Sequence, residues 1–260
     1  MTNGPRGTDN EADRTRLQVA LGCGLTGLAL VVGLRLGLPD GAADILIDKG
    51  GALYPFSVQN GMWIVFCIGL GEVVLRLRVG NFELRQLGRG YLPEDSKTML
   101  RGEDLGPIYR RLGDDTEAQA SFLGRLISRG ILQFQSSRSV EQTSTLLHSS
   151  IDITLHGIDL RYSMLRYIAW LIPSLGFIGT VIGIGSALRW AGDPSHAAAE
   201  DLLSHVTQLL GVSFNGTLVA LVLAACLAFL TNIAQAREEQ ALNRAAQYCL
   251  DNLINRLYVA

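Results

Sequence analysis

The chain has 260 residues, 48% of them apolar and 18% charged, with a formal net charge of -2 at pH 7. Because this balance is near neutral and no basic and aromatic motif occurs, the composition argues against a nucleic-acid-binding protein. The cysteines have no metal-ligand spacing, and the sequence contains no metalloprotease, P-loop or nucleophile-elbow motif, so neither a metal cofactor nor an enzyme is predicted. The arrangement of the apolar residues is more informative, since they gather into four long runs.

The first run, residues 17–38, is interrupted only by Arg35, whose long side chain can reach an interface at the end of a helix. A basic segment precedes this run, as in a signal peptide. The run is nevertheless long for a signal peptide, and no cleavage site of the A-x-A type follows before Pro39. We therefore expect a retained membrane anchor.

The second run, residues 51–71, is uncharged until Glu72. Glu72 is the one carboxylate close to a predicted span. Its position near Arg76 and Arg78 favours an ion pair at the membrane interface over a role in proton transfer.

The segment between the second and third runs is basic and patterned as helix. Helices are predicted around 104–112, over 116–135 and from 140 to 165, the last continuing unbroken into the third run. By the positive-inside rule, this basic excess places the central segment and both chain termini in the cytoplasm. Aromatic residues fit the two interfaces, with Tyr54, Phe56 and Trp190 on the outer side and Tyr162 and Tyr167 on the inner side. The basic residues between the second and third apolar runs are Arg76, Arg78, Arg85, Arg89, Lys97, Arg101, Arg110, Arg111, Arg125, Arg129, Arg138, Arg161 and Arg166.

The third and fourth runs, 167–188 and 206–236, contain no charged residue, and each is long enough to cross a hydrocarbon core of ~30 Å. Small residues along both runs predict close helix packing, because lipid offers no hydrophobic drive for association. The glycines expected to pack helices are Gly176, Gly179, Gly183 and Gly216.

Each of these runs carries a threonine, Thr180 and Thr217. A rise of about 1.5 Å per residue places both hydroxyls roughly 21 to 23 Å from the cytoplasmic boundary, and therefore at one level. Two interpretations are open: each hydroxyl bonds the carbonyl four residues earlier on its own helix, or the two line a polar path. Ser213 and Asn215 are further polar candidates on the same run.

The motif Pro173 with Leu175-Gly176-Phe177-Ile178-Gly179-Thr180-Val181-Ile182-Gly183, followed by Thr217 and by Asn232 fifteen positions later, resembles the MotA/TolQ/ExbB proton channel family. The topology is similar to MotA and the Gly-Thr-Val motif to TolQ and ExbB. The chain departs from the pattern at Cys226, where relatives tend to have proline, and at Val212, where ExbB has glutamate.

The resemblance implies an all-α membrane protein that assembles as a ring of five copies in the bacterial inner membrane. It implies two copies of a single-span MotB/ExbD/TolR-like partner, which supplies the aspartate that this chain lacks at membrane depth. It further implies a stator that converts flow of H⁺ or Na⁺ into mechanical work, with Thr180, Thr217, Ser213 and Asn215 on the ion pathway. Arg110 and Arg111 would then lie on a cytoplasmic surface for the target.

The expected organisation has an N-terminal tail (1–16), two membrane helices (17–75), a cytoplasmic helical domain (76–165), two channel-forming helices (166–236) and a C-terminal cytoplasmic helix (237–260). A non-conducting membrane scaffold that assembles partner proteins is the alternative function. A secondary transporter is disfavoured, because four spans show no inverted repeat.

Overall fold

The computed structural model describes residues 6–37, 39, 46–47, 57–95, 98–195 and 201–258. Within these residues the secondary structure is helical, apart from one isolated bridge between Leu100 and Leu257. The interface positions predicted for Tyr54 and Phe56 lie outside the described residues, as does the start of the second apolar run. The principal helices are α1 (Arg6–Gly37), α3 (Val58–Gln86), α4 (Leu105–Asp114), α5 (Thr116–Ala120), α6 (Phe122–Ser137), α7 (Val140–Gly192) and α8 (Leu202–Asn252).

The chain divides into two compact units. The first comprises residues 1–74 and 164–231, and the second comprises 75–163 and 232–260. Helix α7 is a single 53-residue helix, as predicted from the unbroken pattern that begins at residue 140. The C-terminal segment 237–260, expected as a helix of its own, is the continuation of α8 as far as Asn252.

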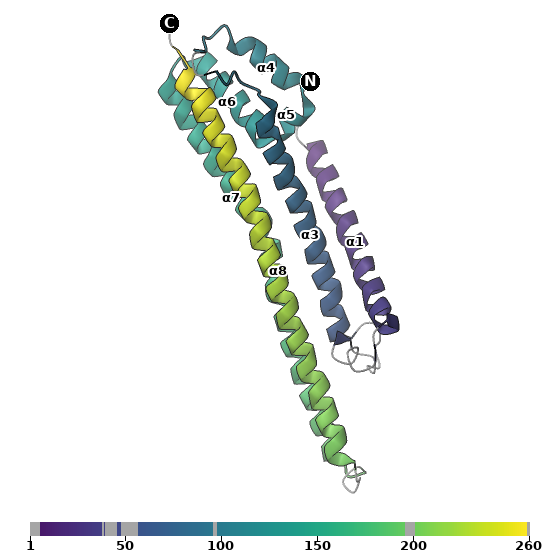
Figure 1. The fold of residues 1–260 in the computed structure, drawn as a ribbon. Coiled ribbons are helices and arrows are strands. Elements are labelled where there is room, and N and C mark those ends of the chain that lie inside the picture. The colour runs from purple at the N-terminus through teal and green to yellow at the C-terminus, as the bar shows by residue number, and fades with distance from the viewer. Residues whose placement is uncertain are drawn as a thin grey trace. The chain divides into compact units, whose positions relative to one another are not determined.

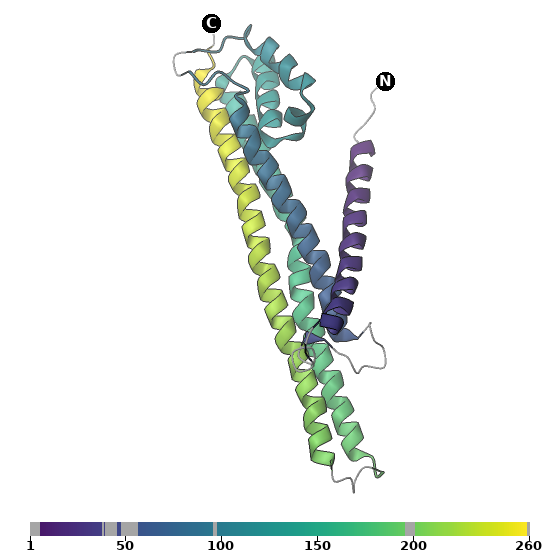
Figure 2. The same ribbon diagram turned by 45° about the vertical axis from the view of Figure 1, so that its right-hand side comes forward.

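Close approaches at glycine hold the helices of the first unit together, and α7 and α8 lie side by side in both views (Figures 1 and 2). A Cβ atom added to Gly27 of α1 would lie 3.0 Å from the Cα of Ile64 on α3. At Gly69 of α3, an added Cβ would lie 2.8 Å from a methyl of Leu227 on α8 and 3.2 Å from a methyl of Ile168 on α7. Small residues thus permit each contact, as expected for helices that associate in lipid.

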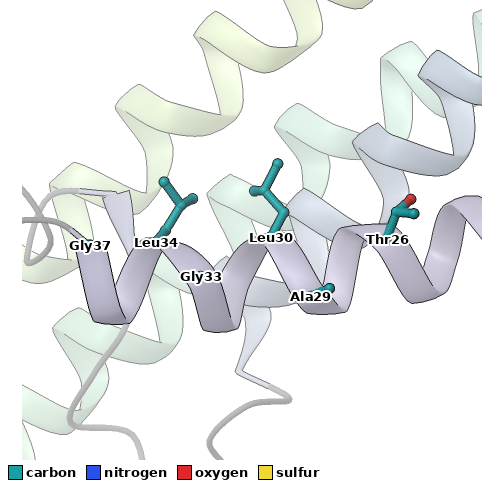
Figure 3. A pocket seen from close by; sticks show the side chains of 6 residues that line it. All are labelled: Thr26, Ala29, Leu30, Gly33, Leu34 and Gly37. Carbon is teal, nitrogen blue, oxygen red and sulfur yellow. The ribbon is translucent and has the colours of Figure 1, made fainter.

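Two described helices are long and apolar enough to cross a membrane: α7, and the helical segment Leu202–Arg256 that begins with α8. Helix α1 contributes a shorter apolar segment, Leu21–Gly37. One face of α1 forms a shallow apolar groove, from which Leu30 and Leu34 project to the same side (Figure 3). Its single hydroxyl, on Thr26, donates to the carbonyl of Cys23 at 2.8 Å. The groove therefore offers hydrocarbon contact and no ion site.

In the second unit the predicted helix 116–135 is broken at Ser121, which separates α5 from α6. The Ser121 side chain accepts a hydrogen bond from the N–H of Gly124 and caps α6. Asp115 caps α5 in the same way through the N–H groups of Glu117 and Ala118. A Cβ at Gly124 would lie 2.1 Å from the carbonyl oxygen of Ala118, so the tight turn between the two helices requires glycine there.

The core of the second unit contains charged and phenolic groups. Glu238 of α8 is completely buried and forms an ion pair with Arg161 of α7. Tyr162, predicted at a membrane interface, has no exposed surface. The Arg76 guanidinium lies 5.9 Å from the centre of the Tyr162 ring. The prediction for Tyr162 is wrong because, within this unit, its ring lies in the core beside the ion pair.

Candidate ion-pathway site

The hydroxyl groups of Thr180 on α7 and Thr217 on α8 are hydrogen-bonded to each other, so the two threonines lie at one level, as helix geometry predicts. Two backbone carbonyls complete the cluster. The carbonyl of Gly176 lies 3.1 Å from the Thr180 hydroxyl and 3.2 Å from that of Thr217. The carbonyl of Ser213 lies 3.2 Å from the Thr180 hydroxyl. Four oxygen atoms from two helices therefore converge at one point.

The hydroxyl groups elsewhere on the same helices behave differently. Five of them bond the carbonyl four residues earlier on their own helix, the common habit of serine and threonine in membrane helices. This holds for Ser174, Ser186, Thr207, Ser213 and Thr231. Thr180 makes such a bond and also reaches across to α8, whereas Thr217 bonds the carbonyl of Gly176 on the opposite helix. The interpretation confined to a single helix therefore does not describe this pair.

Two glycines bring the helix backbones together on either side of the threonines. A Cβ at Gly176 would lie 2.4 Å from the Cβ of Ala220, and one at Gly183 would lie 1.8 Å from the Oγ of Ser213. Glycine therefore sits one turn before and one turn after Thr180, on the face of α7 turned to α8. This spacing allows short threonine side chains to meet between the helices.

The other two predicted packing glycines face α3. A Cβ at Gly179 would lie 3.6 Å from Val58, and one at Gly216 would lie 3.7 Å from the side-chain oxygen of Gln59. Gln59 and Asn60 are buried at the start of α3, 7% and 0% exposed. Neither amide is among the site residues predicted from the sequence, because the prediction for the second apolar run rests on its lack of charge. The signal in the sequence is a pair of uncharged polar residues, Gln59 and Asn60, within an apolar run.

The remaining predicted site residues lie apart from the hydroxyl cluster. Asn215 is two positions from both Ser213 and Thr217, on a different side of α8, and it makes no hydrogen bond to the cluster. Arg110 and Arg111 are exposed on α4 in the second unit. Among the residues that the structure describes, no group of three or more histidine, cysteine, aspartate or glutamate side chains is placed to hold a metal ion.

The number of hydrogen-bond donors and acceptors limits what the hydroxyl cluster can do chemically. The two threonines carry one hydroxyl proton each, and the two carbonyls can only accept. When both protons are donated to carbonyls, the hydroxyl oxygens keep lone pairs that can coordinate a cation or a hydrated proton. Segments 167–188 of α7 and 206–236 of α8 contain no aspartate, glutamate, histidine, lysine or arginine, so neither segment supplies an acid beside the cluster.

A second polar cluster, in the second unit, contains an unusual carboxylate. Glu83 of α3 is 5% exposed and accepts a hydrogen bond from the N–H of Phe122, the first residue of α6, at 2.7 Å. Burial raises the pKa of Glu83 to about 7, against the lowering effects of that N–H and of Arg125. Glu238 raises this pKa further and Arg161 lowers it. Glu83, which is not among the site residues predicted from the sequence, therefore titrates near neutral pH.

Comparison with models of protein families shows to which family the chain belongs. The model of the MotA/TolQ/ExbB proton channel family matches residues 118–247, half of the chain. The chain belongs to the MotA/TolQ/ExbB proton channel family. The resemblance carried by the motif around Thr180 is therefore confirmed. No curated protein and no solved structure matches the chain.

The part of the chain that matches the MotA/TolQ/ExbB family contains the whole candidate site. It begins within α5, includes α6 and α7, and covers α8 as far as Gln247, so Thr180, Thr217 and their glycine neighbours all fall inside it. Helices α1 and α3 fall outside it. As a member of a proton channel family with two apolar helices fit for membrane insertion, the chain is a membrane protein.

Proposed function

We propose that the chain is the channel-forming stator subunit of an ion-driven rotary motor in the bacterial inner membrane. The observation that carries this proposal is the bond between the Thr180 and Thr217 hydroxyls, where segments 167–188 of α7 and 206–236 of α8, which have no charged side chain, meet. An ion that crosses the membrane must exchange its hydration shell for fixed oxygen atoms. This cluster is the polar group of α7 and α8 best suited to that exchange.

The partner in this proposal is a single-span protein with an aspartate in its membrane helix, present in two copies. The chain offers hydroxyl and carbonyl oxygens at the threonine level but no acid, and a proton pathway needs a titratable group. A carboxylate placed beside Thr180 and Thr217 would complete the site, its charge stabilised by donated hydroxyl protons. The transported ion is H⁺, or Na⁺ bound by the same oxygens.

A ring of five copies is the assembly proposed, with α7 and α8 lining the interior and α1 and α3 completing four spans outside them. Large apolar side chains on the first-unit segments of α7 and α8 are exposed in the single chain and need a neighbouring copy or lipid to cover them. They include Phe177, Val181 and Leu188 of α7 and Phe214, Leu218 and Phe229 of α8. Both chain termini and the second unit then lie in the cytoplasm.

The experiment is an ion-flux measurement in liposomes that contain the chain together with a single-span, aspartate-bearing protein encoded beside it. We expect flux down an imposed H⁺ or Na⁺ gradient from the complex and none from this chain alone. The native mass should correspond to five copies and two partner helices. An intact complex that conducts neither ion would overturn the motor proposal and favour the scaffold.

A further inference from the structure

A hollow lies between α6 and α7 in the second unit, and its charged lining is entirely basic. Arg125 and Arg129 come from α6 and Arg161 from α7, with Phe122 among the apolar walls. Gly157 of α7 forms part of the lining, and a Cβ atom built there would meet nothing within 4 Å. We call this site the arginine hollow. Three like charges around one recess repel one another unless an anion sits between them.

Internal contacts leave much of this positive charge uncompensated. Arg129 forms no ion pair with any described residue. Arg161 pairs with Glu238 through Nη2, while its Nε is buried without a hydrogen-bond partner. Arg125 donates to the carbonyl of Ala120 at 3.2 Å. Burial lowers the pKa of Arg125, Glu83 opposes this change, and the neighbouring Arg129 and Arg161 lower the pKa further.

We propose that the arginine hollow is a binding site for a phosphate-bearing anion. Guanidinium groups present forked N–H donors that match phosphate oxygens two at a time, and a phosphoryl group has enough acceptor oxygens for several of them. The hydroxyl of Thr154, also in the lining, donates its hydrogen bond to the backbone carbonyl of Ser150 at 2.7 Å, so the arginines are the donors for an anion. Phe122 and Leu126 are buried apolar walls at one side of the hollow, whereas Arg125, Arg129 and Ile153 are exposed, so an anion can enter from solvent.

The same chemistry is presented by a free phosphate compound and by the headgroup of an anionic phospholipid. The site is separate from the proposed ion pathway, so a conducting ring is compatible with an empty arginine hollow. Binding is therefore measured directly, without reference to ion flux.

The test uses the full-length protein in a phospholipid-free, uncharged detergent. Inorganic pyrophosphate is titrated by calorimetry in one arm, and vesicles of phosphatidylglycerol or phosphatidylcholine are compared in the other. We expect saturable binding of pyrophosphate, or of phosphatidylglycerol in preference to phosphatidylcholine. The arm that saturates identifies the source of the phosphate. No saturable binding in either arm overturns the proposal.

Matched variants locate the site. Arg129→Gln removes one donor fork, and Gly157→Leu fills the recess without a change of charge. Each variant should weaken binding by about tenfold or more. Arg129→Gln does so by loss of charge-assisted hydrogen bonds, and Gly157→Leu does so because the new side chain occupies the space of the anion. Arg85→Gln and Gly106→Leu make the same changes at an exposed arginine and at an open glycine outside the hollow, and should leave affinity within about twofold. Equal losses of affinity in the variants and their controls would mean that binding reflects general surface charge, and this result would overturn the proposed site.

Discussion

The hydroxyl of Thr217 lies 3.2 Å from the carbonyl oxygen of Gly176, a contact that joins α8 to α7. A threonine in a membrane helix ordinarily bonds a carbonyl of its own helix. This one bonds across because Gly176 has no side chain and its carbonyl is approached closely: a Cβ there would lie 3.4 Å from the Cα of Thr217. The polar cluster and the close helix packing are therefore one feature.

Replacement of Thr217 by valine should abolish ion flux while the complex still assembles. Valine keeps the volume but removes a hydroxyl from the cluster, and an ion at that level loses one of its oxygens. The stability cost should be small, since a hydrogen bond between membrane helices is worth about 0.6 kcal/mol on average. Flux in liposomes, with co-purification of the partner, checks both statements.

Thr231→Val is the matched control for this substitution. Thr231 lies on the same helix and bonds only the carbonyl of Leu227, at 2.7 Å. Its loss should cost similar stability and leave flux unchanged. Undiminished flux in Thr217→Val would remove this hydroxyl from the ion path and favour the scaffold function.

Gly183→Ala should push α7 and α8 apart beside the hydroxyl pair. The new Cβ would lie 1.8 Å from the Oγ and 2.7 Å from the Cβ of Ser213, so the backbones must separate. Overpacking of this kind costs about 1 to 3 kcal/mol. We expect a lower thermal unfolding midpoint in detergent and reduced flux.

Gly185→Ala, two residues away on the same helix, meets nothing within 4 Å and serves as the control, with an unchanged midpoint. The double variant Gly183→Ala/Ser213→Gly removes the obstructing atoms and should recover most of the loss. A fully stable Gly183→Ala single variant would contradict the close approach of the two helices.

Glu83 should make the stability of the protein depend on pH. Its pKa of about 7 in the folded protein exceeds the ordinary value of 4.5, so between these values the folded state holds a proton that the unfolded state releases. Stability should therefore fall as pH rises through this window, by up to about 1.4 kcal/mol per pH unit, and level off above it. Thermal unfolding midpoints between pH 4.5 and 8 measure this dependence.

Glu83→Gln should flatten the slope in that window, because glutamine keeps an oxygen for the N–H of Phe122 but does not titrate. Glu103→Gln removes an exposed carboxylate from the same unit and should retain the slope of the original protein. If Glu83→Gln retained the slope, another group would be responsible for it.

Reversal of charge at Arg110 and Arg111 tests the surface proposed for a cytoplasmic target. Both side chains are exposed on α4, whose buried residues are Leu105 and Leu112, so the fold should tolerate Arg110→Glu/Arg111→Glu. We expect normal assembly and flux in liposomes, with loss of the cellular process that depends on the gene. Reversal of Arg85 and Arg244, which are exposed elsewhere, is the control. Failure of the ring to assemble would make Arg110 and Arg111 structural.

The sequence by itself determined the helical class, the family and the common level of Thr180 and Thr217. The helical class follows from periodicity and the family from the resemblance of the motif around Thr180. The common level follows from the position of each threonine along its own helix, because a rise of about 1.5 Å per residue converts spacing into depth. The start of α7 and its unbroken continuation follow for the same reason, because no helix-breaking residue interrupts the pattern until Pro173, which α7 accommodates.

The tertiary structure alone decided which atoms meet between helices. It pairs Thr217 with Gly176, turns Gly179 and Gly216 to α3, and buries Tyr162 and Glu238 in the second unit. A sequence gives the face that a residue occupies on its own helix, but the rotation of one helix against another follows from side-chain packing over its whole length. The raised pKa of Glu83 and the arginine hollow arise in the same way, since burial and neighbouring charges come from segments distant in the chain.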